Sequence, residues 1–392
     1  MNSVPHSSSL AARLRQRPKF PPLWLSLTLS AVLLLLLWPR ERAYLQAACI
    51  LTQLDGHPVP RLLRPVAALP VTTQTLTIAS AAGAIPARLY TPVHRPHAPG
   101  MVIVPGIHYL GMNEPRLVAF ANSMAGCGLR VLTPELPDSK DYRITPSDVA
   151  AIGDAVQWLR QKSGRRVGLM GLSFSGGLAL MAAAQPPYSN DVSLVFTVGA
   201  HDDLYRVAMF YVTGADPLPG GDVERVPPNT YGPLVLEYEH IADFLSVGDI
   251  APLQTALRAR LYEDPALEKK LVDFMTPAQQ ADYKRLVDVQ RQESAIAASN
   301  NKNAPEMAQL SPHGHLAGLH VPVYLLHGRG DDLIPFAEAI WLARDLPHGT
   351  VADLLVTPLI AHVGPTRRTP GLYDEWRLLH LMAQVLERAE HE

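Results

Sequence analysis

A short apolar run near the middle of the chain leads through a turn of small residues into an apolar helix. Val167 to Met170 form the run, and Leu178 to Ala184 have the composition of a helix. Between them lies the segment Gly171-Leu172-Ser173-Phe174-Ser175-Gly176-Gly177. This order predicts a buried strand, a tight turn and a helix, with Ser173 at the apex of the turn. Glycines on both sides remove Cβ atoms that would block the turn or a substrate.

Composition and missing motifs exclude several classes of function. The turn has neither G-x-x-x-x-G-K-[ST] nor G-x-G-x-x-G, so it is neither a phosphate loop nor a dinucleotide site. The formal net charge of −2 gives no reason to expect a nucleic-acid partner. Two cysteines, Cys49 and Cys127, are too few for a disulfide framework or a zinc cluster. The 392 residues, 47% of them hydrophobic, suffice for a large core.

Three further apolar runs end in segments that carry polar side chains. Met101 to Val104 leads into Pro105-Gly106-Ile107-His108, and Ser193 to Gly199 is followed by His201-Asp202-Asp203. Val321 to Leu326 leads into His327-Gly328-Arg329-Gly330-Asp331-Asp332-Leu333-Ile334-Pro335. A last short run, Asp353 to Thr357, precedes a loop that contains His362. Strands that alternate with helices predict a mostly parallel sheet with its site at the carboxyl ends of the strands.

These motifs, in this order, resemble the serine hydrolases of the α/β-hydrolase superfamily, which include esterases, lipases and dienelactone hydrolases. The turn resembles their G-x-S-x-G nucleophile elbow, although Ser175 stands where the last glycine is expected. The resemblance implies an α/β-hydrolase fold with Ser173 as nucleophile, Asp331 as the acid and His362 as the base. It also implies an oxyanion hole formed by the backbone N–H of Phe174 and that of Ile107 or His108.

Several alternatives for the site remain open at this stage. Ser175 is a rival nucleophile, and we favour Ser173 because Gly171 stands two residues before it. Asp202 and Asp203 are rival acids, because some α/β-hydrolases carry the acid after the strand that follows the elbow. His201, at the same strand end, is a candidate for lining the pocket or for capping a helix.

The resemblance divides the chain into a catalytic body and an insertion. We expect the α/β-hydrolase domain to comprise residues 71–203 and 316–392. Residues 204–315 contain helical stretches without convincing strand pairs, and they predict a helical cap that selects substrates. The asparagine-rich end of this insertion, residues 299–303, is predicted to be a loop.

The N-terminal region predicts a membrane anchor. Residues 20–39 carry no charge and would span about 30 Å as a helix, the thickness of a bilayer core. Basic residues are more frequent before this stretch than after it, so residues 1–19 are expected on the cytoplasmic side. Residues 40–70 would form a juxtamembrane connector. This organisation predicts a single-pass membrane protein whose catalytic domain is extracytoplasmic.

The chemistry implied by the resemblance is hydrolysis of a small-molecule carboxylic ester through an acyl-enzyme. A serine peptidase or a thioesterase would use the same triad, and a non-catalytic binding module on this fold is the alternative from another class. No cofactor is expected. No metal centre is expected either, because His313-Gly314-His315 has no matching set of ligands nearby in the sequence.

Overall fold

The structure is a computed structural model that describes residues 40–80, 83–95, 97–245, 250–289, 292–360 and 371–391. Residues 1–42 and 43–392 form two separate units, and the account below concerns the second. Among the described residues, no helix combines the length and the apolar character that crossing a membrane requires. The predicted span 20–39 lies outside the described residues.

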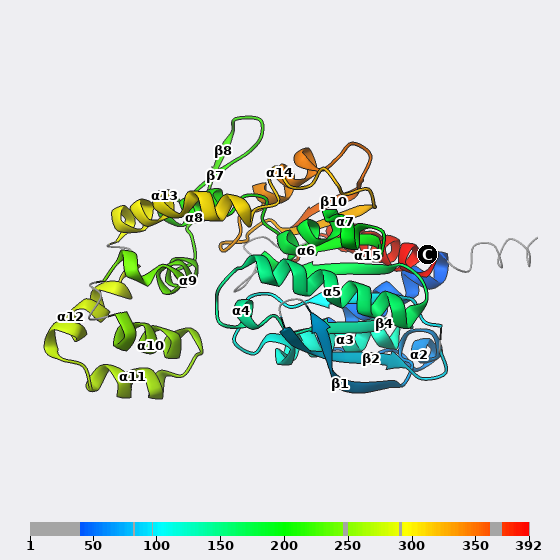
Figure 1. The fold of residues 1–392 in the computed structure, drawn as a ribbon. Coiled ribbons are helices and arrows are strands. Elements are labelled where there is room, and N and C mark those ends of the chain that lie inside the picture. The colour runs from blue at the N-terminus through cyan, green and yellow to red at the C-terminus, as the bar shows by residue number, and fades with distance from the viewer. Residues whose placement is uncertain are drawn as a thin grey trace, which may run out of the picture. The chain divides into compact units, whose positions relative to one another are not determined.

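An eight-stranded sheet organises the body, in the order β1-β2-β4-β3-β5-β6-β9-β10 (Figure 1). The first two strands pair antiparallel, β2 pairs antiparallel with β4, and all other neighbours are parallel. The predicted α/β-hydrolase fold with a mostly parallel central sheet is therefore confirmed. The strands are β1 Val71–Ser80, β2 Gly83–Pro92, β3 Gly100–Val104, β4 Arg130–Pro134, β5 Val167–Leu172, β6 Val192–Val198, β9 Val323–Gly328 and β10 Val351–Thr357.

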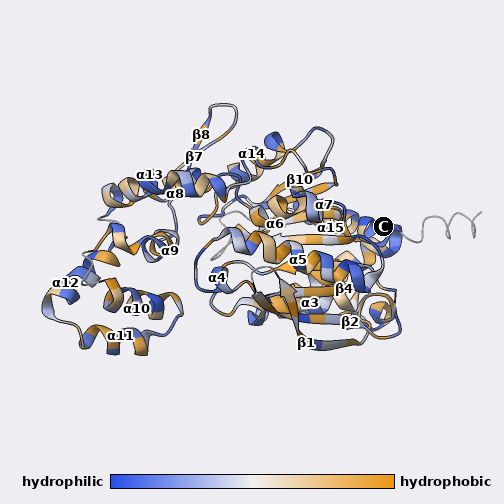
Figure 2. Cartoon of the chain, viewed as in Figure 1, coloured by the Kyte–Doolittle hydropathy of each residue, from blue (hydrophilic) through white to orange (hydrophobic). Residues whose placement is uncertain are grey.

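The central strands are buried because helices cover both faces of the sheet. On one face, side chains such as Val102 and Leu169 belong to one hydrophobic cluster with helices α5 (Pro146–Ser163), α6 (Phe174–Ala184) and α14 (Ala337–Asp345). On the other face, side chains such as Met101 and Met170 pack with α3 (Pro115–Gly126), α15 (Leu372–His391) and the helix over 43–54. Figure 2 shows apolar residues concentrated along these strands. Short helical pieces complete the body: η1 Arg61–Leu63, α2 Arg64–Ala67, η2 Gly111–Asn113, α4 Pro137–Lys140 and α7 Pro186–Ser189.

Between β6 and β9 the chain is mainly helical, and its helices contribute most of a hydrophobic cluster of their own. Figure 1 shows several of these helices grouped apart from the sheet. The elements are α8 Leu204–Thr213, β7 Ala215–Pro217, β8 Val223–Arg225, α9 Tyr231–Glu239, η3 Ile241–Asp243, α10 Ile250–Leu261, α11 Pro265–Asp273, α12 Pro277–Leu286 and α13 Glu293–Gln309.

Two predictions about this insertion were wrong. First, β7 and β8 form a two-stranded antiparallel sheet where no strand pair was expected. Second, residues 299–303 are not a loop but part of α13. Asn300 is buried there and donates a hydrogen bond from Nδ2 to the carbonyl oxygen of Ala208 in α8, at 3.0 Å. Packing against α8 thus outweighs the low helix propensity of asparagine.

Candidate active site

Ser173 lies at the carboxyl edge of the sheet, between the end of β5 and the start of α6. Its backbone has φ 56° and ψ −136°, and it is one of four non-glycine residues with positive φ in the described part of the chain. Its N–H donates to the carbonyl oxygen of Val198 at 2.8 Å, and its carbonyl oxygen accepts from Gly176 N–H at 2.8 Å. These bonds hold a backbone conformation that a non-glycine residue adopts only at a cost.

The turn is possible only because its glycines lack side chains. A Cβ on Gly171 would lie 2.5 Å from both the Cα of Gly176 and the carbonyl oxygen of Ser175. A Cβ on Gly177 would lie 2.3 Å from the ring of His201. The strand and the helix therefore approach each other more closely than residues with a Cβ at these two positions would allow. This close approach places Ser173 at a sharp apex.

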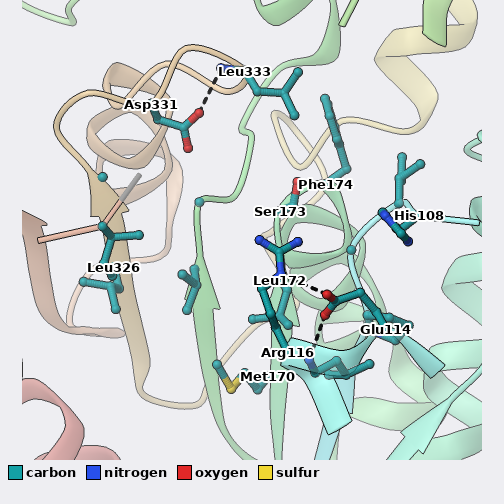
Figure 3. A pocket seen from close by; sticks show the side chains of 18 of the residues that line it. His108, Glu114, Arg116, Met170, Leu172, Ser173, Phe174, Leu326, Asp331 and Leu333 are labelled. Carbon is teal, nitrogen blue, oxygen red and sulfur yellow. Dashed lines mark hydrogen bonds and ion pairs between the residues drawn. The ribbon is translucent and has the colours of Figure 1, made fainter. Parts of the chain in front are cut away.

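The loop after β3 lies against the same turn. A Cβ on Gly106 would be 3.3 Å from the Cβ of Ser173, so the two segments touch. Ile107 and His108 follow in this loop, and both line the cavity that contains Ser173 and Phe174. Figure 3 shows His108, Ser173 and Phe174 in this cavity. Phe174 is the first residue of α6, where backbone N–H groups have no partner within the helix. The structure thus brings the three predicted oxyanion-hole residues to the serine's cavity.

His108 is folded back onto its own loop. Its Nδ1 accepts a hydrogen bond from the N–H of Leu110 at 3.2 Å, and its ring stacks on Tyr109 at 4.7 Å between centroids. Burial lowers the pKa of His108 below its usual value, against the opposing effect of the carboxylates of Glu263 and Glu114. The ring is therefore neutral at pH 7, with Nδ1 used as an acceptor.

Asp331 lies in the loop after β9 and is almost fully buried in the wall of the cavity. Its Oδ1 accepts hydrogen bonds from the N–H groups of Leu333 and Ile334, both at 2.9 Å. Its Oδ2 lies 3.6 Å from Nε2 of His327, which donates to the carbonyl oxygen of Ile334 at 2.8 Å. The loop therefore fixes the position of the carboxylate, and one of its bonds is drawn in Figure 3.

His362 lies outside the described residues. The chain that leads to it is described as far as residue 360, and Leu359 and Ile360 line the cavity of Ser173 and Asp331. The preceding strand β10 pairs in parallel with β9, and Thr357 lies opposite Gly328. The strand that precedes His362 and the strand that precedes Asp331 therefore end at the same edge of the sheet.

Comparison with known families decides the class of this site. The sequence profile of the X-Pro dipeptidyl-peptidase (S15) family matches residues 138–362, which is more than half of the chain. The chain belongs to the S15 family. It is a serine hydrolase of the α/β-hydrolase superfamily, as its motifs predicted. A search of curated protein sequences gave no match.

Solved structures that resemble this S15 family member include peptidases and esterases. An acylaminoacyl peptidase of Pyrococcus horikoshii is 13% identical, with a TM-score of 0.45 and coverage of 80% of this chain. The chain spans 40% of that peptidase's length. An esterase of Pyrobaculum calidifontis is 15% identical, with a TM-score of 0.41 and coverage of 89% and 91% of the two chains. A bacterial brefeldin A esterase is 17% identical, with a TM-score of 0.42 and coverage of 88% and 86%.

The alternative site residues of this S15 family member do not line the cavity of Ser173. Ser175 is fully buried in α6, and its Oγ has no hydrogen-bond partner among the described residues. Asp203 caps α8, where its Oδ1 accepts from the N–H groups of Tyr205 and Arg206. Asp202 is fully buried and pairs with Arg206 at 2.8 Å. Burial raises the pKa of Asp202 to about 7.

His201 packs behind the cavity wall. Its ring is fully buried and occupies the space that a side chain on residue 177 would need. The centroid of the ring lies 5.5 Å from that of the Phe174 ring. Burial lowers the pKa of His201 to about 4, so the ring is neutral at pH 7. Its Nε2 lies 3.4 Å from the carbonyl oxygen of Leu310. His201 thus packs against the ring of Phe174 and is not one of the residues that line the cavity.

The cavity has a volume of about 1420 Å³ and extends from the serine to the inserted helices. Several of the residues that form its wall could not be predicted from the sequence, because no motif surrounds them. Tyr211 comes from α8, and Tyr231, Leu236 and Glu239 come from α9. The helical insertion was predicted to select substrates, but the sequence did not indicate which of its residues line the site. Among the described residues, the one group of His and carboxylate side chains spaced to hold a metal ion does not line this cavity.

Proposed function

We propose that this S15 family member cleaves a carboxylic ester through an acyl-enzyme on Ser173. In this mechanism His362 removes the serine proton during attack and returns it to the leaving group. Asp331 orients the imidazole and stabilises the imidazolium that forms. The observation that carries the proposal is the strained backbone of Ser173 in a cavity that also contains the buried carboxylate of Asp331.

The N–H groups of Phe174 and of Ile107 or His108 would stabilise the oxyanion of the tetrahedral intermediate. Two features support this assignment: the start of α6 at Phe174 and the contact between Gly106 and Ser173. Each such donor contributes about 3–4 kcal/mol to transition-state stabilisation in well-studied hydrolases. Aliphatic side chains in the cavity wall, among them Leu204, Val207 and Leu333, suit an apolar acyl group.

A peptidase is the second candidate, and two observations favour it. The family's description is that of an X-Pro dipeptidyl-peptidase. In addition, Glu239 places a carboxylate in the cavity wall, where its Oε1 accepts from the N–H of Ile144 at 3.2 Å. Burial raises the pKa of Glu239 to about 7, and a cationic group such as a free amine would favour its ionised form.

The membrane location is a further part of the proposal. Residues 20–39 would anchor the chain as a single span, with residues 1–19 in the cytoplasm and the catalytic domain (71–203 and 316–392) with its cap (204–315) outside. The uncharged stretch of residues 20–39 supports this arrangement. Extraction of membranes with alkaline carbonate tests it: the full chain should stay with the lipid, and a chain that begins at residue 40 should not.

Labelling with a fluorophosphonate probe tests the chemistry. The full chain should be labelled at Ser173, as mapped by mass spectrometry, and the Ser173→Ala and His362→Ala variants should not be labelled. The Ser175→Ala variant should keep its label. Rates on p-nitrophenyl esters of increasing acyl length, compared with an X-Pro p-nitroanilide, then separate esterase from peptidase. A folded chain that takes no label would contradict the triad and favour the binding-module alternative.

A further inference from the structure

The loop after β3 is in contact with the nucleophile on one side and with the insertion on the other. Toward the nucleophile, a Cβ on Gly106 would lie 3.3 Å from the Cβ of Ser173. Toward the insertion, Ile107 and Tyr109 pack against the hydrophobic cluster that the inserted helices mainly form. The position of the loop that carries the candidate oxyanion donors therefore depends on the insertion as well as on the sheet.

Three aromatic rings form a stack that leads from this loop to the end of α10. The rings of His108 and Tyr109 have centroids 4.7 Å apart and planes inclined by 28°. The ring of Tyr109 stacks in turn on that of Tyr262, at 5.3 Å and 25°. Tyr262 directly follows α10 in the sequence. Stacked aromatic pairs at such separations attract each other, so the insertion holds Tyr109 through a direct contact.

The ring of Tyr262 is itself fixed in orientation. Its hydroxyl donates to Oδ1 of Asp141 at 2.9 Å and accepts from Nη2 of Arg258 at 3.0 Å. The guanidinium carbon of Arg258 lies 4.9 Å from the centre of the ring, and Nε of Arg258 pairs with the same Asp141 oxygen at 2.7 Å. Tyr262 therefore offers Tyr109 a ring surface that is held by the body of the protein through Asp141.

Strained backbone marks both sides of this attachment. The buried hydroxyl of Tyr142 donates to the carbonyl oxygen of Leu261 at 2.6 Å, and the hydroxyl of Tyr109 donates a longer bond to Oε2 of Glu263, at 3.4 Å. Tyr142 and Glu263 have φ of 59° and 57°. Together with Ser173, they are three of the four non-glycine residues with positive φ in the described part of the chain. Such strain persists where the surrounding contacts enforce it, and it is frequent at functional sites.

We propose that Tyr262 is a positioning residue for the reaction, whose ring holds the loop of Ile107 and His108 against the oxyanion formed on Ser173. The inference rests on the proposed acyl-enzyme. Tyr262 is not one of the residues that line the cavity, so it acts through Tyr109 and not on the substrate. A backbone donor stabilises the oxyanion only at hydrogen-bond distance, and misplacement by about 1 Å can lower a rate by roughly 100-fold.

A positioning role and a merely structural role predict different kinetics. The oxyanion bond is stronger in the transition state than in the substrate complex, so a displaced loop lowers kcat and leaves KM nearly unchanged. Loss of the insertion's packing would instead disturb the cavity wall that Tyr231 and Leu236 form. That change would raise KM and lower the melting temperature. The division of the effect between kcat and KM therefore distinguishes the two roles.

Hydrolysis of a p-nitrophenyl ester by the full chain tests the inference. In Tyr262→Ala, kcat should fall by roughly 10–100-fold while KM stays within about twofold, and the rate of fluorophosphonate labelling should fall in parallel. Tyr262→Phe keeps the stacked ring and should bring kcat to within about threefold of the unaltered chain. Phe274→Ala, which removes an exposed ring from the insertion, is the control and should leave both constants unchanged.

The Tyr109→Ala variant shows whether the effect passes through the stack. If it does, Tyr262→Ala should lower kcat little further in a chain that already lacks the Tyr109 ring, because the two rings act as one unit. Tyr262→Leu keeps apolar bulk without a ring and takes the place of Tyr262→Ala if that variant does not fold. It should lower kcat as the alanine variant would.

Several results would overturn the inference. A labelled, active chain whose kcat is unchanged by Tyr262→Ala or Tyr262→Leu would do so, as would a loss that Tyr262→Phe does not restore. Fully additive effects of the Tyr109 and Tyr262 variants would show that the two rings act separately. In these cases the proposed function would stand, because the unaltered chain would still be labelled at Ser173. A folded, unaltered chain that takes no label would overturn both.

Discussion

Gly171 and Gly176 are in such close contact that a Cβ on Gly171 would lie 2.5 Å from the Cα of Gly176. This contact joins the end of β5 to the first turn of α6, and the backbone of Ser173 is bent between them. The obstructing atoms belong to backbone, so they cannot rotate away as a side chain would. The geometry of the proposed nucleophile therefore depends on two residues that carry no reactive group.

The first prediction concerns the Gly171→Ala variant. We expect it to lose about 1–3 kcal/mol of stability or more, because overpacking against backbone forces the strand and helix apart. The rate at which a fluorophosphonate labels Ser173 should fall in this variant as well. Gly220→Ala is the matched control, since no atom lies within 4 Å of its added Cβ. Thermal unfolding of both variants measures the effect, and equal stability of the two would contradict it.

The second prediction concerns the Ser175→Ala variant. Ser175 is fully buried in α6, and its hydroxyl has no hydrogen-bond partner among the described residues. Removal of an unsatisfied buried hydroxyl, together with the better helix propensity of alanine, should stabilise the fold by about 1 kcal/mol. Urea unfolding measures the gain, and ester hydrolysis should stay within twofold of the unaltered chain. A loss of hydrolysis equal to that of Ser173→Ala would instead make Ser175 the nucleophile.

The elbow could be predicted from the sequence because its causes are local. A buried run, small residues and a helix follow one another within the segment 167–184, so their order is visible without the fold. The ion-pair group in which His313 lies between the carboxylates of Asp202 and Asp345 could not be predicted in this way. Its members come from three elements, and only the packing of the loop after α13 against the end of β6 brings them together.

The inserted helices illustrate a second limit of sequence analysis. The strands β7 and β8 have three residues each, and Pro217 ends the first, so no alternating pattern marks them. Residues 299–303 have the composition of a loop, yet the hydrogen bond from Asn300 to Ala208 holds them in a helix. In both cases tertiary contacts decide the structure, and the local preference of the residues does not.

The third prediction concerns the Asp331→Asn variant. An asparagine can keep Oδ1 as the acceptor for Leu333 and Ile334, so the loop should remain folded and the melting temperature should change little. The negative charge is lost, and with it the orientation of the base. We expect kcat for ester hydrolysis to fall by roughly 10³–10⁴-fold. The neighbouring Asp332→Asn variant is the control. Equal rates for the two variants would remove Asp331 from the mechanism.

The fourth prediction concerns the pH dependence of stability. Glu237 in α9 is fully buried, and its Oε1 accepts from Nε2 of Gln292 at 3.2 Å. Burial raises the pKa of Glu237 from 4.5 to about 8. A carboxyl whose pKa is higher in the folded state binds its proton more tightly there. Its contribution to stability is therefore complete below pH 4.5 and is lost as the pH rises through about 8.

The Glu237→Gln variant should remove this loss, because a glutamine stays neutral and keeps the same acceptor oxygen. We expect its melting temperature to fall less than that of the unaltered chain between pH 6 and pH 9. The exposed Glu293→Gln variant should keep the full decline, since water solvates the ionised form of that residue in both states. Melting curves at four pH values give the comparison. Parallel declines in all three chains would show that Glu237 ionises freely in the folded protein.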